Sequence, residues 1–151
     1  MSYLSGEKLI EELVEGFSSF KDNNTNRGDW LVLNSGNSDH YAILRPGAST
    51  IEWITLSHYR PFWATIIEVW QQYGGGDSDT QSLTKLEALS QEILDGMLPY
   101  RKLRDPTGDV LESKISEMGE VEEIIINGAL EWIRQNITVA WSEDIAVTFE
   151  E

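Results

Sequence analysis

The strongest strand signal in the sequence is FWATIIEVWQQY, residues 62–73. Aromatic and β-branched residues dominate this segment, and those residue types favour strands. Both faces are apolar over residues 62–67, which indicates a central strand that is covered on both sides. The run GGGDSD, residues 74–79, then ends the strand and predicts a flexible loop. The triple glycine does not indicate a P-loop, because no Lys-Ser or Lys-Thr pair follows it.

Before this strand, the sequence predicts one helix and two or three strands. Residues 5–20 have the spacing of an amphipathic helix, with Ser5 as its N-cap. The polar residues 21–28 predict a loop. Residues 30–34 and 41–45 then predict an antiparallel hairpin, and Pro46-Gly47 ends its second strand. Residues 50–56 alternate in a way that fits either a short strand or an extended linker.

After the central strand, a second helix is predicted over residues 80–98. Its apolar stripe contains Leu83, Leu86, Leu89, Ile93 and Met97. The charged residues 100–117 predict a partly extended and mobile segment. A strand is expected over 121–127 and a turn or bulge at Gly128. Residues 129–135 fit a strand or a short helical turn, and 137–149 predict a closing strand with a bulge or bend.

This order of elements predicts an α+β fold, a mainly antiparallel sheet with two helices packed on one face. The chain has 151 residues, which is the length of a single domain, so we expect residues 1–151 to form one domain with mobile loops near 74–79 and 100–117. Its six tryptophans all lie in or beside predicted strands. Most are therefore expected in the core, and one or two at subunit contacts.

The composition excludes several classes of function. With 26 acidic and 11 basic residues, the net charge is −15. Such a chain is poorly suited to bind duplex nucleic acid or an anionic membrane surface, because both need cationic contacts. Without cysteine it has no disulfides and no thiolate metal ligands. No apolar run approaches the length of a membrane span, and no signal peptide is expected, so we expect synthesis in a cytoplasm.

No residue pattern predicts catalysis, a cofactor or a metal. The two histidines, His40 and His58, fall in different predicted loops without metal-ligand spacing. Ser57 and His58 are neighbours in sequence, which does not make a catalytic triad, since its members meet in space. We therefore expect no enzyme. The basic residues Arg101, Lys102 and Arg104, just before the acidic stretch 109–123, fit either a solvated surface or a contact between subunits.

The order of elements resembles the tail terminator (tail completion) proteins of long-tailed bacteriophages. The matching features run along most of the chain. They are the N-terminal amphipathic helix, a strand opened by Trp30, a strand ending in Arg45-Pro46-Gly47, the residues Ser57 and Arg60 ahead of the aromatic strand, the helix 80–98, and the alternating C-terminal strand from Ile137 to Phe149. The long acidic segment 100–123 departs from a short version of this pattern.

The resemblance implies a structural virion protein at the head-proximal end of the tail. It would form a homohexameric ring that stacks on the major tail tube protein and receives a head-completion or neck protein. DNA would pass through the lumen without specific binding, since acidic walls repel phosphate. The resemblance also implies docking or subunit contacts by the two loops and the basic cluster, through Gly74, Gly75, Gly76, Asp77, Asp79, Arg101, Lys102 and Arg104.

Two other functions remain open at this point. The acidic charge also suits an inhibitor or DNA mimic whose carboxylates imitate phosphates and block a basic nucleic-acid-binding protein. The element order also suits another neck or connector subunit of related fold. The number of copies in the assembly separates these hypotheses, because a closed ring is not expected of a mimic.

Overall fold

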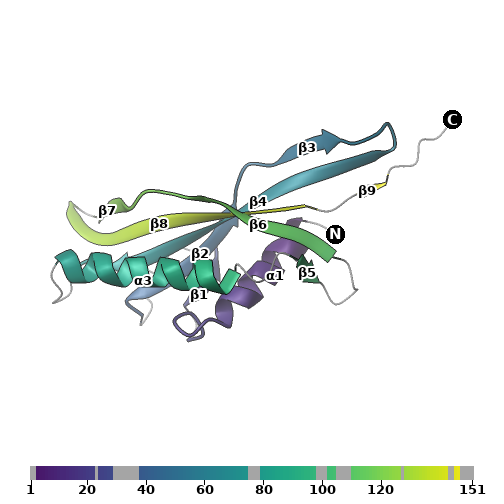
Figure 1. Ribbon diagram of the computed structural model, residues 1–151. Helices are drawn as coiled ribbons and strands as arrows, with labels where there is room; N and C mark the ends of the chain where they lie inside the picture. The colour runs from purple at the N-terminus through teal and green to yellow at the C-terminus, as the bar shows by residue number, and fades with distance from the viewer. Residues whose placement is uncertain are drawn as a thin grey trace.

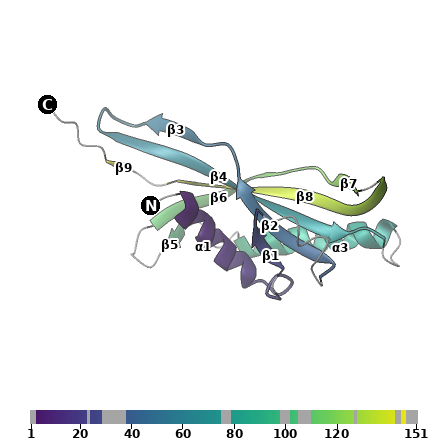
Figure 2. The same ribbon diagram turned by 180° about the vertical axis from the view of Figure 1, so that it is seen from behind.

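The fold is described from a computed structural model, which covers residues 3–22, 24–28, 38–74, 79–97, 102–104, 110–126, 128–142 and 145–146 (Figure 1). In these ranges it contains helix α1 (Tyr3–Glu15), helix α3 (Asp79–Met97) and one nine-stranded sheet. Both helices lie on the same face of the sheet (Figures 1 and 2). The predicted α+β class is confirmed.

Six strands form the main path of the sheet. Their order is β1 (Thr25–Arg27), β2 (His40–Pro46), β4 (His58–Gln72), β8 (Ala129–Ser142), β6 (Val110–Met118) and β5 (Lys102–Arg104). Three more lie off this path. These are β3 (Thr50–Trp53) and β9 (Ile145–Ala146), which pair with β4, and β7 (Glu122–Ile126), which pairs with β8. Among the described pairs, only β1 and β2 run parallel.

Strand β4 is the centre of the sheet, as the sequence predicts. One edge pairs with β8 from Phe62↔Ser142 to Gln72↔Trp132. The other edge pairs with β2 from Pro46↔Thr65 to His40↔Gln71. The run that is buried on both faces is 67–71, however, and not 62–67, whose residues are mostly half-buried. The early residues of β4 are less covered because they approach the end of the helix layer (Figure 1).

The hydrophobic core has two parts, one on each face of the sheet. On the helix side, apolar residues of α1 and α3 pack on the inward residues of β4 and β8, among them Ile10, Ile93, Ile67, Val69 and Ile137. On the other face lies a smaller cluster of Tyr41, Ile43, Trp70 and Trp132, with Ile124 of β7 against it. Burying each such side chain contributes roughly 1.5–3 kcal/mol.

Several predicted boundaries near the N-terminus are wrong. Helix α1 begins at Tyr3, so Ser5 lies inside it and is not its N-cap. The helix ends at Glu15, and residues 16–20 continue as turns, with Phe20 N donating to Phe17 O. Phe20 is nevertheless fully buried, so the apolar spacing predicted burial rather than helix. In the predicted loop 21–28, residues 25–27 form β1.

The described residues contain one of the two strands of the predicted hairpin of 30–34 with 41–45. Residues 41–45 lie in β2, which ends at Pro46 as predicted. Residues 30–34 lie outside the described ranges. Over residues 42–44, however, β2 has β1 on one edge and β4 on the other. The ladder that holds this part of β2 is therefore not the predicted hairpin.

In the second half of the chain, helix 80–98 and strand 121–127 are confirmed within a few residues. Leu83 belongs to the predicted apolar stripe of this helix, but its side chain is 46% exposed and not buried. The segment 100–117 includes β5 and most of β6, so its described part is extended, as predicted, and belongs to the sheet. Residues 129–135 belong to β8 and form no helical turn. Gly128 has φ +80° in the tight turn between β7 and β8.

Candidate functional site

A strand hairpin projects from the body of the protein. It consists of β3, the turn 54–57 and the first residues of β4, and we call residues 50–62 the arm. Its ladder runs from Thr50↔Phe62 to Trp53↔Tyr59. Strand β9 adds a third strand by pairing with His58 and Tyr59. Figures 1 and 2 show the arm extending past both helices.

The arm exposes four large apolar side chains. Ile51 is 64% exposed, Trp53 58%, Ile54 50% and Leu56 89%. The rings of Trp53 and Tyr59 lie 5.2 Å apart, so the aromatic surface is ordered along one side of the hairpin. Large apolar side chains gathered in this number on one exposed hairpin are typical of a surface that a partner covers. The arm is therefore the strongest candidate for an interaction surface.

The turn at the tip of the arm is held by its own hydrogen bonds. The backbone NH groups of Ile54 and Thr55 donate to the His58 carbonyl at 3.0 and 3.2 Å. The Thr55 hydroxyl oxygen accepts from the NH groups of Ser57 and His58 at 3.2 and 3.0 Å. Because these bonds form without a partner, the tip is ordered in advance, which lowers the entropy cost of docking.

The tip also brings together Ser57 and His58, the neighbour pair noted in the sequence. Ser57 Oγ lies 3.2 Å from His58 Nδ1, and Thr55 Oγ1 lies 3.3 Å from the same atom. Within the described ranges, no carboxylate is hydrogen bonded to His58 to orient it as a base. The site is on an exposed tip and not in a cleft. The geometry does not support nucleophilic catalysis here.

The root of the arm is tightly packed. Trp63 lies against Trp141 of β8, and Trp141 Nε1 donates to Thr65 Oγ1 at 3.2 Å. Gly47, where the chain leaves β2 for the arm, donates from its NH to the Ala64 carbonyl at 2.8 Å. A Cβ at position 47 would lie 2.9 Å from the Ala64 Cβ. Glycine therefore permits the close crossing that directs β3 along the outer part of β4.

A charged network crosses the face of the sheet opposite the helices. Glu68 is fully buried on β4 and accepts hydrogen bonds from Arg45 of β2 at 2.8 Å and Arg134 of β8 at 3.3 Å. Arg134 also contacts Glu122 of β7 at 2.5 Å, and its guanidinium lies 5.1 Å from the centre of the Trp70 ring. These contacts join β2, β4, β8 and β7, so the network fixes the sheet that supports the arm.

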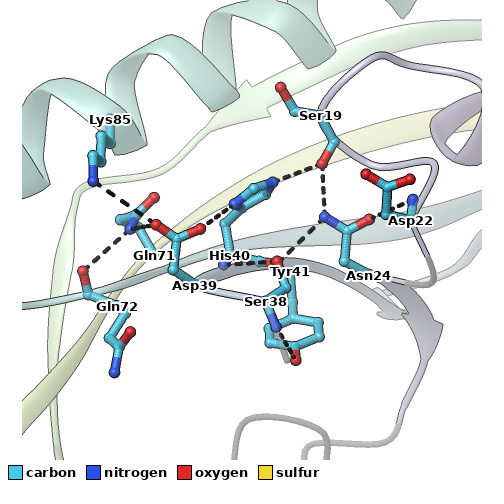
Figure 3. A network of polar contacts seen from close by, with 10 residues as sticks. All are labelled: Ser19, Asp22, Asn24, Ser38, Asp39, His40, Tyr41, Gln71, Gln72 and Lys85. Atoms are coloured by element: carbon cyan, nitrogen blue, oxygen red, sulfur yellow. Dashed lines mark hydrogen bonds and ion pairs between the residues drawn. The ribbon is translucent and has the colours of Figure 1, made fainter. Parts of the chain in front are cut away.

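A second polar network lies on the helix side of the sheet, between the start of β2 and α3 (Figure 3). His40 Nδ1 is 2.6 Å from Asp39 Oδ1, and His40 Nε2 is 2.6 Å from the backbone carbonyl of Ser19. Lys85 of α3 and Gln71 of β4 both approach Asp39 Oδ2, at 3.8 and 3.4 Å. These residues line a shallow groove of about 380 Å³.

The contacts in this groove join β2, β4, α3 and the turn at Ser19. Both ring nitrogens of His40 take part, one with a carboxylate and one with a main-chain carbonyl. Burial acts to raise the pKa of Asp39, but hydrogen bonds from His40 and Gln71 and the nearby His40 and Lys85 charges outweigh it. The pKa of Asp39 is therefore lowered from its ordinary value.

Helix α1 carries a third charged group, remote from the arm tip. Glu7 is buried and lies 2.7 Å from Arg27 of β1, while Glu11 lies 3.7 Å from the same guanidinium. Burial and the neighbouring Glu15 raise the pKa of Glu11, and Arg27 opposes them. The ion pair of Arg27 with Glu7 thus links β1 to α1. The negative charge of Glu11 is only partly compensated by Arg27, because Glu15 lies one helical turn away.

The structure does not bring the sequence-predicted contact residues together. Lys102 and Arg104 lie in β5, whose partner β6 reaches Ser142 and so the root of the arm. Gly74, with φ +82°, follows the other end of β4, and Asp79 is the first residue of α3. The two ends of the β4–β8 ladder, at Phe62 and Gln72, lie about 33 Å apart at 3.3 Å per residue. The basic residues of β5 and the loop after β4 are therefore at different ends of the sheet. Arg101, Gly75, Gly76 and Asp77 lie outside the described residues.

The sequence does not identify the arm as a site. Residues 50–56 fit a strand or a linker, and no pattern assigns a role to their apolar side chains. A weak signal was available, because Ile51 and Trp53 alternate with Ile54 and Leu56 on both faces of one short segment. Such a pattern is typical of a strand buried on both faces, and sequence alone does not separate burial in a core from burial by a partner.

Comparison of the sequence with protein-family models gives no match, and comparison with curated protein sequences gives none either. Among the described residues, no group of three His, Cys, Asp or Glu side chains could hold a metal ion. In the same part of the chain, neither helix is both long and apolar enough to cross a membrane.

Proposed function

We propose that this chain is a structural subunit that assembles with further copies of itself into a ring, and that the ring is a tail terminator of a long-tailed bacteriophage. The observation that carries the proposal is the projecting arm, with four large apolar side chains in water. Its hexameric state, its tail-tube and neck partners and its place in a virion follow from the resemblance described above.

The energetics of the arm favour an assembly function. Full burial of a large apolar side chain contributes roughly 1.5–3 kcal/mol, so four of them can drive association. A hairpin that projects from the body offers a convex surface, which suits a protein partner and does not enclose a small molecule. The preformed tip further favours docking without rearrangement.

The net charge of −15 is compatible with a tube through which DNA slides. Strongly acidic walls repel phosphate and leave no cationic contact to hold it. The DNA-mimic hypothesis also uses this charge, but it needs carboxylates in a row on one face. The described glutamates of β7, Glu122 and Glu123, are consecutive on a strand and therefore point to opposite faces. The assembly function is favoured for this reason.

Native mass spectrometry across a concentration series tests the proposal directly, with negative-stain electron microscopy to identify closed rings. The expected species is about six times the mass of the chain. A matched pair of variants links assembly to the arm. Leu56→Ser is expected to weaken the ring, whereas Leu83→Ser, which removes an exposed leucine from α3, is expected to leave it unchanged. A stable isologous dimer, or a one-to-one complex with a basic protein and no ring, would contradict the proposal.

A further inference from the structure

The ring of His40, at the start of β2, lies between two groups that can only accept hydrogen bonds. Its Nδ1 is 2.6 Å from Asp39 Oδ1, and its Nε2 is 2.6 Å from the backbone carbonyl oxygen of Ser19 (Figure 3). A main-chain carbonyl has no proton to donate, and the lowered pKa of Asp39 keeps its carboxylate ionised at neutral pH. Both ring nitrogens must therefore donate, and only a doubly protonated histidine has two N–H groups.

We infer that His40 is an imidazolium at neutral pH and forms a pH-sensitive bridge, in which the charged ring joins Asp39 to the turn that contains Ser19. We call these three residues the His40 bridge. The inference is independent of the proposed function, because it concerns one proton within a single copy of the chain. Histidine is suited to this role, since small changes in its surroundings move its charge change across the physiological pH range.

Loss of one ring proton breaks the contact with Ser19 and keeps the contact with Asp39. The remaining proton stays on Nδ1, because an ionised carboxylate is a stronger acceptor than a neutral carbonyl. The lone pair of Nε2 then faces the Ser19 oxygen at 2.6 Å, and two acceptors repel each other at that distance. The ring and the turn must move apart. The stabilising effect of the bridge is therefore present at mildly acidic and neutral pH and is lost as the pH rises.

The charged groups around the ring come from three parts of the chain. Asp39 precedes β2 and contacts the ring directly. From α3, Lys85 approaches the other carboxylate oxygen of Asp39 at 3.8 Å, and Glu92 lines the same groove. The turn after α1 adds Lys21 and Asp22, which are both exposed. Asp39 and Glu92 favour the charged ring, and Lys85 opposes it. The histidine side chain is 24% exposed, so its proton can exchange with water.

The bridge holds a turn that carries a core residue. Phe20 follows Ser19 and is fully buried in the helix-side core. Its ring packs edge-on against the ring of His40, with the centroids 5.7 Å apart and the planes at 82°. The same turn is also held by the side-chain amide of Asn24, which donates to the Ser19 carbonyl at 2.6 Å. Because that bond does not need the ring proton, we expect the turn to open locally at high pH while the sheet and α3 stay folded.

Nitrogen-15 NMR of the histidine rings, from about pH 5 to about pH 9, tests the protonation state. The chain has two histidines, and the exposed His58 is the internal reference. At neutral pH, both ring nitrogens of His40 should show the signature of N–H. The titration midpoint of His40 should lie about one pH unit or more above that of His58, which is a tenfold difference in proton affinity. A His40 ring that is neutral at neutral pH, or that titrates at or below His58, overturns the inference.

Two matched variants separate the direct contact from a general effect of charge. Asp39→Asn removes the carboxylate beside the ring and should lower the midpoint of His40 towards that of His58. Asp22→Asn makes the same change in net charge at an exposed site of the same network and should leave the midpoint of His40 unchanged. Equal shifts in the two variants would show that the acidity of the whole chain keeps the ring charged, and the bridge would be wrong.

Hydrogen exchange tests whether the ring proton controls the turn. The Phe20 NH donates to the Phe17 carbonyl at 2.9 Å and reports opening of the turn, and the NH of Ile93 inside α3 is the reference. After correction for intrinsic exchange, protection of Phe20 should fall about tenfold across the titration of His40, the linked counterpart of a shift of one pH unit, while that of Ile93 stays constant. In His40→Gln, whose amide does not titrate, protection of Phe20 should no longer depend on pH.

The two measurements can reject the bridge separately. If the ring is charged but the protection of Phe20 in the wild type does not change with pH, the proton does not hold the turn and the bridge is wrong. If the protection of Phe20 falls equally in wild type and in His40→Gln, another group controls the turn, and the bridge is again wrong. Both measurements use the wild-type chain, so neither depends on the folding of a variant.

Discussion

Trp63 of β4 lies against Trp141 of β8 with their ring centroids 4.6 Å apart and their planes inclined at 38°. The two residues are also direct partners in the ladder. Trp141 is 1% exposed, whereas Trp63 is half-buried, so the pair marks the boundary between the closed body and the projecting arm. Whatever holds Trp141 in place also determines the direction in which the arm leaves the body.

Gly6 of α1 is the residue that makes room for Trp141. A Cβ at position 6 would lie 2.2 Å from the indole ring. Gly6→Ala is therefore expected to lower the free energy of unfolding by about 1–3 kcal/mol, as overpacking of a core does. Urea denaturation measures this change, with Lys8→Ala as an exposed control on the same helix. Combining Gly6→Ala with Trp141→Phe should cost less than the sum of the two single changes, and strict additivity would contradict the contact.

Glu68 is expected to be the most sensitive charged residue in the sheet. It is fully buried between Arg45 and Arg134. Glu68→Gln removes the buried charge that accepts from both guanidinium groups, while Arg134 keeps its contact with Glu122, so the free energy of unfolding should fall by about 1.5–3 kcal/mol. Glu122, at the outer end of the same network, is half exposed. Glu122→Gln should cost less than about 1 kcal/mol. Chemical denaturation of both variants checks the contrast, and equal effects would show that burial does not control the network.

The groove in Figure 3 predicts a pH dependence of stability. The pKa of Asp39 is lowered in the folded state, so its stabilising effect is complete above the ordinary aspartate pKa, about 3.9. That effect is lost as the pH falls through the lower folded value. Asp39→Asn should therefore reduce the melting temperature at neutral pH, and the difference from wild type should shrink below about pH 4. A constant difference down to pH 2 would contradict the assignment.

Asp22→Asn is the matched control for this experiment. Asp22 is an exposed neighbour in the same network, and its backbone NH, rather than its carboxylate, bonds Asn24. Its removal changes the net charge as Asp39→Asn does but leaves the His40 contact in place.

The pKa of Glu11 shifts in the opposite direction to that of Asp39, because burial and the neighbouring Glu15 raise it. Its ionisation opposes folding as the pH rises through the ordinary glutamate pKa, so Glu11→Gln should not lower the melting temperature at neutral pH.

The sequence predicted those elements whose local pattern and tertiary role agree. Strand 62–73 and helix 80–98 are rich in residues that favour their structure, and their apolar faces meet in one core. Strand β1 could not be found in this way, because Thr25, Asn26 and Arg27 carry no apolar signal. It forms because β2 has an open edge to which backbone groups can bond, as Gly28 N does to Leu44 O.

Strands β5 and β6 could not be identified from the sequence for a related reason. Their charged composition suggested a mobile segment, but charged residues are also what natural edge strands use to avoid aggregation. The residues of the charged network were equally hidden from sequence. Arg134 and Glu68 are 66 positions apart, and only the pairing of β4 with β8 brings them into contact. The exposure of the arm depends on where the helix layer ends, which no local pattern encodes.

A single strand, β4, runs from the tip of the arm to the far end of the body, and this has a mechanical consequence. Its ladder with β8 contains eleven residue pairs, from Phe62↔Ser142 to Gln72↔Trp132. Antiparallel hydrogen bonds lie perpendicular to the strands. A tensile load on the arm along this axis is therefore carried in shear by many bonds at once, and they must rupture together rather than unzip in turn. A subunit held by its arm under such a load would resist extraction better than one held by a peripheral loop.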